Sequence, residues 1–316
     1  VVGDSFDQRT GLPVFSLYAE TKKPTKAMLS NIDALVIDLQ DIGTRSYTFV
    51  SAMKRAMEGC FEHGVEVIVL DRPNPLGGLK VDGPLLDARL ARNNYVGAFR
   101  VPYVHGLTIG ELARMTKEAP DLHFPAALRS RGKLTVIPMR GWSRSMRWPE
   151  TGLKWIPTSG GIQDFEAVQG YAMLGLGCFF DPASNFDIGF RHGVGVAHPF
   201  RGLTCRHLGP TALEKELRAL NLPGVQFRRI TGPDPNGRPT PGIYVDIVDY
   251  DAWRPVELSA HLMALAARLA PDNPFAPAAG RSFTLFLMHM GSTAFLADLA
   301  ARGAGVDIEA WVGLWR

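Results

Sequence analysis

Three aspartates stand directly after short apolar runs, at positions where their carboxylates can take part in proton transfer. Asp38 and Asp41 follow the run at 34–37, and Asp71 follows the run at 65–70. One carboxyl group can act as a general acid while a second acts as a base or nucleophile, which is the chemistry needed to break a glycosidic bond. We therefore take Asp38, Asp41 and Asp71 as the candidate catalytic residues.

Each of these aspartates also has a structural alternative. Asp41 is suited to cap the helix that follows it, because a short carboxylate can accept hydrogen bonds from the first free N–H groups of a helix. Asp71 is suited to pair with Arg72 or Arg45 and so hold a loop in place. Asp38 ends its strand directly, and we expect it to be the least exposed of the three.

Side chains suited to hold a polar, anionic ligand lie around the aspartates. Arg45 and Arg72 suit an anionic group, because a guanidinium can grip a carboxylate with two parallel hydrogen bonds. Gln40 and Asn74 suit hydroxyl or acetamido groups, and His105 is open to either a ligand contact or a structural role. The candidate binding residues are Gln40, Arg45, Tyr47, Arg72, Asn74, His105 and Trp155.

Trp155 belongs to a group of three tryptophans in a short, charged segment. Trp142 and Trp148 are the other two. A tryptophan ring can stack on the apolar face of a sugar, or it can anchor a loop on the core. The sequence leaves both roles open and favours loop anchoring.

The elements that must position these residues are buried strands. The runs at 34–37 and 65–70, and a further one at 134–139, are rich in branched apolar residues. Such runs are typical of parallel strands that helices cover. Ligands of open α/β sheets bind beyond the carboxyl ends of the strands, which is where the aspartates lie. We predict an α/β fold with a Rossmann-like, mainly parallel sheet and helices on both faces.

A helix is expected between the first two strands. Its periodic pattern covers about 44–62, and Gly64 ends it in the usual way, because glycine adopts the left-handed conformation of a helix end easily. Thr108 and Glu111 have the spacing of a capping box, in which each side chain bonds the other residue's backbone N–H. That spacing predicts a helix that begins at Thr108, shortly after His105.

The character of the chain changes after about residue 206. Alternating patterns at 225–230 and 242–248 predict strands, and 283–287 is a further candidate strand. We predict a Rossmann-like domain at 1–206 and a smaller α+β domain at 207–316. The helices expected in the second domain cover 211–220, 255–269, 292–302 and 308–314.

Composition excludes several classes of function. The 316 residues carry a formal net charge of +3 from 34 basic and 31 acidic residues, which gives no reason to expect a nucleic-acid partner. No apolar stretch reaches the roughly 18 residues of a membrane helix, so we expect no membrane insertion. The first residue is Val1 and no signal peptide is visible, so either a segment was removed or the chain begins inside a longer one.

Cofactors and metals are not expected either. The Gly-x-Gly at 193–195 lacks a third glycine and a strand-to-helix setting, which disfavours a nucleotide-dependent enzyme. The odd number of cysteines (Cys60, Cys178 and Cys205) favours free buried thiols over a disulfide framework. Four further candidates for metal binding match no zinc spacing. They are His192, His198, Cys205 and His207.

Six motifs in the chain are shared with one family. Together they resemble the NamZ-like exo-acting N-acetylmuramidases. They are DLQDIGTRSYTF at 38–49, LDRPNPLGG at 70–78, DGPLLD at 82–87, HGLTIGELA at 105–113, WPETGLKW at 148–155 and DYDAWRPV at 249–256.

The resemblance implies a fold, an activity and a setting. The fold is a Rossmann-like domain followed by a smaller accessory domain, with the site in the cleft between them. The activity is release of terminal N-acetylmuramic acid from the non-reducing end of peptidoglycan fragments, without a cofactor. The setting is the bacterial cell envelope or the extracellular space, and the partner is a peptidoglycan-derived saccharide.

The chain also departs from the family pattern. Family members carry a Pro-Glu-His-Gly segment whose glutamate is the proposed acid/base, and residues 1–316 contain none. The segments 157–161 and 185–193 also differ from the family's own sequences. A second function, a non-catalytic protein that binds amino sugars or muropeptides, therefore stays open.

Overall fold

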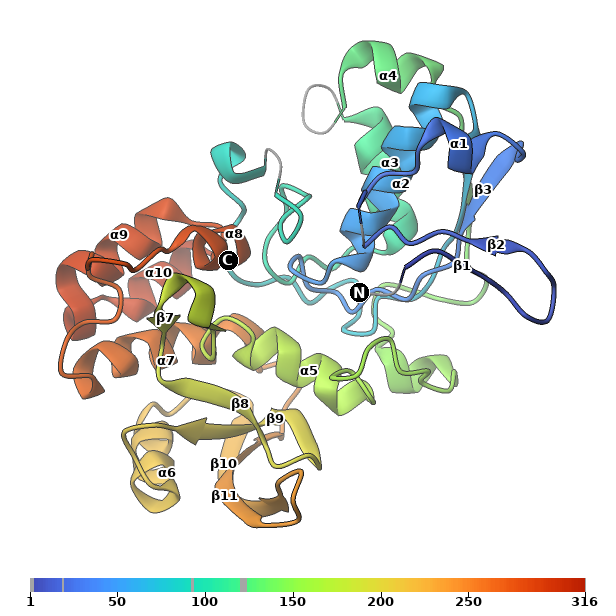
Figure 1. Ribbon diagram of the computed structural model, residues 1–316. Coiled ribbons are helices and arrows are strands. Elements are labelled where there is room, and N and C mark those ends of the chain that lie inside the picture. The colour runs from blue at the N-terminus through green and yellow to red at the C-terminus, as the bar shows by residue number, and fades with distance from the viewer. Residues whose placement is uncertain (1–2, 19, 92–93, 120–123, 316) are drawn as a thin grey trace.

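The computed structural model describes residues 3–18, 20–91, 94–119 and 124–315. Figure 1 shows two lobes: the blue-to-green first part of the chain forms one, and the yellow-to-red second part forms the other. Loops of the first part lie between them in this view.

The first lobe is built on a parallel sheet. Helices α2 (Phe49–His63) and α3 (Ile109–Glu118) pack on one face of it, where Val67 and Val69 are fully buried. The parallel Rossmann-like sheet predicted from the apolar runs is therefore confirmed. Its strands, in spatial order, are β3 (Ala34–Ile37), β4 (Glu66–Leu70) and β5 (Leu134–Ile137).

The opposite face of this sheet is more open than the sequence predicts. Val36 on β3 is 54% exposed and Ile137 on β5 is 47% exposed. The sequence predicts helices on both faces, but within the described ranges we find helices packed on one. Val36 is exposed between the half-buried Leu35 and the buried Ile37, because successive side chains of a strand point to opposite faces of the sheet.

The turn after β3 delays the start of α2. Residues 43–45 pair with 103–105: Arg45 N–H donates to the Tyr103 carbonyl at 2.7 Å and His105 N–H donates to the Gly43 carbonyl at 3.2 Å. This extended pairing keeps the chain out of the helical conformation, so the helix begins at Phe49 and not at Thr44. Its end at Gly64 and the capping box of Thr108 and Glu111 are both as predicted.

The second lobe contains an antiparallel sheet with the order β10-β11-β9-β8. Helix α6 (Pro210–Ala219) packs against it. Two of its strands precede residue 206 and two follow it, and the division at 206/207 remains a prediction. The strands are β8 (Phe190–Val194), β9 (His198–Cys205), β10 (Val225–Pro233) and β11 (Pro239–Ile247).

The segment expected as a strand at 283–287 is helical. Phe283, Phe286, Leu287 and Met290 follow helical spacing, and Gly291 ends the helix in a left-handed conformation with φ of 89°. A short apolar run fits a strand or a buried helix equally well, and here the helical spacing decides. The helices of this lobe are α5 (Phe165–Leu174), α7 (Pro255–Leu269), α8 (Thr284–Met290), α9 (Thr293–Arg302) and α10 (Ile308–Leu314).

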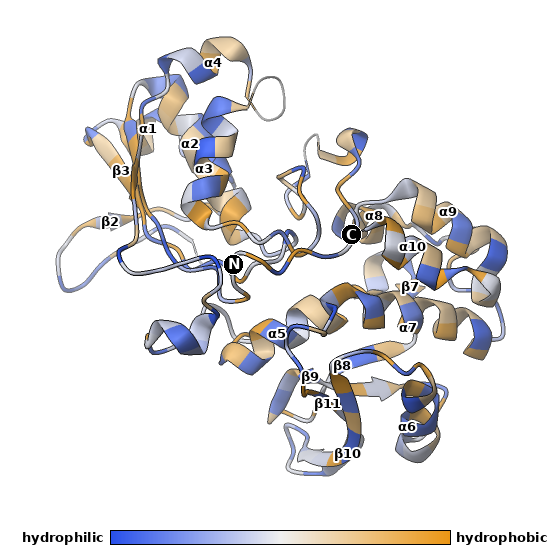
Figure 2. Cartoon of the chain, turned by 180° about the vertical axis from the view of Figure 1, so that it is seen from behind, coloured by the Kyte–Doolittle hydropathy of each residue, from blue (hydrophilic) through white to orange (hydrophobic). Residues whose placement is uncertain are grey.

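Both lobes bury an apolar core. Figure 2 shows hydrophobic and hydrophilic residues alternating along the helices of each lobe, as expected of helices with one buried side. Within the described residues no single helix is long and apolar enough to cross a membrane; one pair, α8 with 293–305, meets the criterion together but is bent by 119°. Short elements complete the fold: β1 (Ser5–Phe6), β2 (Pro13–Val14), α1 (Lys26–Leu29), α4 (Ala126–Arg131), β6 (Phe180–Asp181) and β7 (Phe186–Asp187).

Candidate functional site

A cavity of about 380 Å³ lies at the carboxyl ends of the parallel strands. Asp38 follows β3, Asp71 and Arg72 follow β4, and Trp142 comes shortly after β5. We call this space the strand-end cavity; its walls include Asp38, Asp71, Arg72, Pro73, Trp142 and Leu153. The position matches the general place of ligands in open α/β sheets.

Asp38 and Arg72 form an ion pair in the wall of this cavity. The Arg72 Nε donates to Asp38 Oδ1 at 2.6 Å. This hydrogen bond lowers the pKa of the Asp38 carboxyl and raises the pKa of Arg72. The Asp38 side chain is 47% exposed, so the expectation that it is the least exposed aspartate is wrong. It stands at the rim because the chain turns inward only after it, at Asp41.

Asp71 is held by donors at the start of α3. Its Oδ1 accepts from the Gly110 N–H at 2.8 Å and from the Arg72 N–H at 3.0 Å. Its Oδ2 accepts from the Thr108 hydroxyl at 2.9 Å. The carboxylate therefore serves the helix N-terminus, where a negative charge is favourable. This replaces the predicted alternative in which Asp71 pairs with an arginine side chain.

A second polar group lies inside the turn after β3. We call it the buried polar cluster, and it consists of Gln40, Asp41, Thr44, Arg45 and His105. Five of its side-chain atoms are buried and have no hydrogen-bond partner among the described residues, although such atoms in proteins are nearly always bonded. They are Gln40 Oε1, Asp41 Oδ1, Thr44 Oγ1, Arg45 Nε and His105 Nε2.

Asp41 and His105 face each other in this cluster. Asp41 is 4% exposed, and its Oδ2 accepts from the Gly43 N–H at 2.8 Å and lies 3.3 Å from His105 Nε2. His105 Nδ1 accepts from the Leu107 N–H at 3.1 Å, so a neutral ring carries its proton on Nε2, facing the carboxylate. The contact is close but not aligned as a hydrogen bond. The predicted helix cap at Asp41 is wrong, because the carboxylate bonds the turn at Gly43 and α2 starts later.

Arg45 is committed to backbone carbonyls. Its guanidinium donates to the carbonyls of Pro84 and Val101, both at 2.7 Å. It also donates to those of His289 at 3.0 Å and Met290 at 2.8 Å, which belong to α8 in the other lobe. Burial lowers its pKa to about 10. The terminal nitrogens of Arg45 are thus occupied by backbone carbonyls, and the side chain links the cluster to α8. The sequence had predicted a ligand contact for Arg45 instead.

Gln40 and Asn74 are also tied to backbone. Gln40 Nε2 donates to the carbonyls of Asp41 at 2.7 Å and Pro73 at 2.9 Å, which leaves its Oε1 without a donor. Asn74 donates to the Leu107 carbonyl and accepts from the Leu76 N–H, both at 3.0 Å. Asn74 therefore holds loops together, and Gln40 keeps one free acceptor.

The two aromatic candidates lie away from the cavity wall. The Tyr47 hydroxyl donates to Thr158 Oγ1 at 2.7 Å, and burial raises the pKa of Tyr47. Trp155 donates from Nε1 to the Ile162 carbonyl at 3.3 Å and packs edge-on against Trp148. This geometry is that of a loop anchor. The tryptophan at the cavity is Trp142, which sequence reasoning did not select although it follows β5 much as Asp71 follows β4.

The histidines that the sequence offered as a metal cluster lie apart along one hairpin. Cys205 pairs with Phe190 and His198 pairs with Val194, which places them at opposite ends of β8 and β9. His192 stacks on Phe200 with ring centroids 4.0 Å apart.

Comparison with known proteins assigns both halves of the chain. Residues 1–166 match the N-terminal domain model of exo-beta-N-acetylmuramidase NamZ, and residues 178–316 match its C-terminal domain model. The chain belongs to the NamZ family. The matched regions contain both the strand-end cavity and the buried polar cluster.

Individual relatives support the same assignment. The chain is 35% identical over 276 residues to the peptidoglycan beta-N-acetylmuramidase NamZ of Bacillus subtilis (strain 168), which covers 86% of this chain and 62% of that protein. The chain thus spans less than two thirds of that relative's length.

Two crystal structures from Bacteroides fragilis NCTC 9343 have a similar fold, and both are of DUF1343 family proteins. BF0371 matches with a TM-score of 0.80 and 35% identity, covering 97% of this chain and 77% of its own. BF0379 matches with a TM-score of 0.69 and 24% identity, covering 98% of this chain and 77% of its own, and it supports the fold alone.

Proposed function

We propose that this NamZ-family chain is a glycoside hydrolase that releases terminal N-acetylmuramic acid from peptidoglycan fragments. The family and the activity for which the Bacillus subtilis relative is named support this reaction class. The partner is then a peptidoglycan-derived saccharide, and the place of action is the bacterial cell envelope or the extracellular space.

The observation that carries the proposal is the Asp41–His105 pair. Asp41 is buried, its Oδ1 has no partner, and the other oxygen faces the imidazole at 3.3 Å. A carboxyl group beside an imidazole can hold a proton and pass it on, which is the role of the acid in glycoside hydrolysis. We assign proton transfer to Asp41, with His105 as the residue that positions it.

The second carboxyl group comes from the strand-end cavity. Asp38 and Asp71 line the open space, where a sugar ring can approach them. The transition state of glycoside hydrolysis carries positive charge on the sugar, which a nearby carboxylate stabilises or attacks as a nucleophile. We assign this role to either Asp38 or Asp71. Substituting each of them by asparagine in turn would show which one is needed for turnover.

The binding roles follow from the same geometry. Arg72 lines the cavity, and its guanidinium suits the lactyl carboxylate that distinguishes muramic acid from glucosamine. Gln40 Oε1 is a buried acceptor without a donor, which suits an acetamido N–H or a hydroxyl group. Arg72 is then the residue that distinguishes N-acetylmuramic acid from N-acetylglucosamine.

The direct experiment is hydrolysis by this chain of a chromogenic β-N-acetylmuramide, with the matching N-acetylglucosaminide as control. The proposal expects chromophore release from the first substrate only. Equal release from both would contradict the role of Arg72, and release from neither would contradict catalysis by the residues present.

The second candidate is a non-catalytic protein that binds amino sugars or muropeptides. It is favoured by the fact that Asp38 and Asp71 already have partners. Calorimetric titration with N-acetylmuramic acid distinguishes the two, because binding without turnover supports the second candidate and turnover excludes it.

A further inference from the structure

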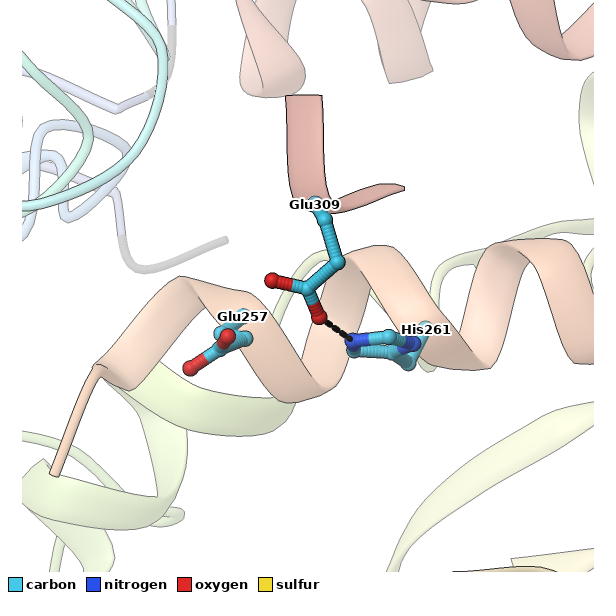
Figure 3. A group of neighbouring side chains, drawn as sticks. All are labelled: Glu257, His261 and Glu309. Atoms are coloured by element: carbon cyan, nitrogen blue, oxygen red, sulfur yellow. Dashed lines mark ion pairs between the residues drawn. The ribbon is translucent and has the colours of Figure 1, made fainter. Parts of the chain in front are cut away.

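Three side chains that commonly bind metals meet at a place separate from the candidate site. Glu257 and His261 lie on α7, and Glu309 lies on α10, which crosses it (Figure 3). One ligand atom from each lies within 4.8 Å of the other two. The spacing of four residues places Glu257 and His261 one above the other on the same helix face.

The nitrogen at the centre of this group has no hydrogen-bond partner in the part of the chain that the structure describes. His261 Nε2 is buried and lies 3.6 Å from Glu309 Oε1, which is longer than a hydrogen bond. Figure 3 shows the imidazole edge and the Glu309 carboxylate facing each other across this gap. The nitrogen has an ion-pair contact with Glu309 in place of a hydrogen bond within 3.5 Å, which leaves it available to a ligand.

The charges around His261 also favour a cation. Glu257 is 3% exposed, and the Arg254 guanidinium lies 3.6 Å from its Oε1, which is likewise beyond hydrogen-bond distance.

We propose that Glu257, His261 and Glu309 form a binding site for a divalent transition-metal ion of the zinc class. An imidazole with two carboxylates is a donor set that zinc accepts, with water completing the coordination. Magnesium and calcium prefer oxygen ligands alone, so the histidine selects against them. The Glu309 side chain is 73% exposed, which gives an ion a path from solvent.

An ion here would join two helices that are distant in sequence. The Glu309 carboxylate on α10 would be fixed to α7. The first turn of α7 is also bound by Asp82 of the first lobe, whose carboxylate accepts from the Val256 N–H at 2.8 Å. Metal binding would therefore add a link from the C-terminal helix to the helix that both lobes contact.

The test is calorimetric titration of the chelator-treated whole chain with zinc chloride, and separately with magnesium chloride. The proposal expects one zinc ion per chain and no magnesium binding. Glu309→Gln keeps the fold, because the side chain is largely exposed, and it is expected to weaken zinc binding at least about tenfold, since even the loss of an indirect metal contact commonly costs that much. His261→Ala is expected to have the same or a larger effect.

Matched controls use residues of the same type in the first lobe. Glu118→Gln changes an exposed carboxylate on α3, and His63→Ala changes an exposed histidine on α2, so neither is expected to alter zinc binding. Cobalt chloride provides a spectroscopic check, because coordination by His261 gives visible absorption that Glu309→Gln reduces. The proposal is overturned if zinc does not bind, or if its affinity is unchanged in both Glu309→Gln and His261→Ala.

Discussion

The strand-end cavity and the buried polar cluster both include residues that follow β3, but they differ in exposure. Asp38 and Arg72 at the cavity are partly exposed, whereas Asp41, Arg45 and His105 in the cluster are buried. In the cavity the Asp38 carboxylate is paired with Arg72 and Asp71 has three donors. In the cluster Asp41 is 4% exposed and keeps an oxygen with no partner. The carboxylates at the cavity have hydrogen-bond partners, whereas one buried oxygen of Asp41 has none among the described residues.

This difference teaches where the chemistry is to be sought. A satisfied, exposed ion pair contributes little free energy and is easily replaced by water. An unpartnered buried polar atom is costly, and it is retained where it serves a function that the rest of the structure supports. We therefore propose that Asp41 transfers the proton and that the bound saccharide extends from the cavity to the turn at 40–45, because a general acid must lie within hydrogen-bond reach of the atom that it protonates.

The largest effect on stability is expected from Arg45→Met in the cluster. This change leaves the carbonyls of Pro84, His289 and Met290 without their donor, while the Val101 carbonyl keeps the Leu86 N–H at 3.3 Å. Each lost partner costs about 1–3 kcal/mol, so the free energy of unfolding should fall by at least about 3 kcal/mol. Urea denaturation measures it, with Arg72→Met in the cavity as the control, which should cost below about 1 kcal/mol. Similar losses in both variants would remove the distinction between the two regions.

A pair of glycine substitutions sharpens the comparison at smaller cost. Gly43 and Gly141 both have a left-handed backbone, with φ of 81° and 77°. An added Cβ at Gly43 would lie 2.4 Å from Asn74 Oδ1, whereas at Gly141 it meets no atom within 4 Å. Gly141→Ala should cost about 1 kcal/mol from backbone strain alone, and Gly43→Ala about 1–3 kcal/mol more from overpacking. Thermal denaturation of the two variants side by side gives the difference, and equal melting temperatures would contradict tight packing of the cluster.

The sequence predicts much of this framework because the signals are local. The helix at 255–269 was expected with the bounds that α7 has, and the apolar runs located all three parallel strands. Of the catalytic candidates, Asp38 and Asp71 line the strand-end cavity, whereas Asp41 lies buried in the turn after β3, and their catalytic roles remain predictions.

What the sequence did not predict depends on contacts between distant segments. The exposure of Asp38 and the burial of Asp41 are set by the pairing of 43–45 with 103–105, which no local pattern reveals. Arg45 contacts α8, which lies more than two hundred residues away in the sequence, so no local pattern predicts that it links the lobes. Glu309 reaches His261 in the same manner, by the crossing of two helices.

The smallest effect is expected from Asp38→Asn. Arg72 lowers the pKa of Asp38 in the folded protein, so the pair stabilises the fold above the ordinary value of 3.8, and this contribution is lost as the pH falls through the lowered pKa. At neutral pH the variant should lose below about 1 kcal/mol, and less at high salt, because the pair is half exposed. The two stability curves should converge toward the acid end of a pH series of urea midpoints. If the two proteins still differed in stability at acid pH, the stabilisation by this pair would not come from the charge of Asp38.

The central claim is that Asp41, and not the exposed Asp38, transfers the proton. The most direct measurement is kcat for the chromogenic β-N-acetylmuramide in Asp41→Asn and Asp38→Asn, with circular dichroism to confirm that both variants fold. We predict that kcat falls about 10²–10⁴-fold in Asp41→Asn, the usual cost of losing a general acid, and that it falls less in Asp38→Asn. Undiminished turnover in Asp41→Asn would contradict the account.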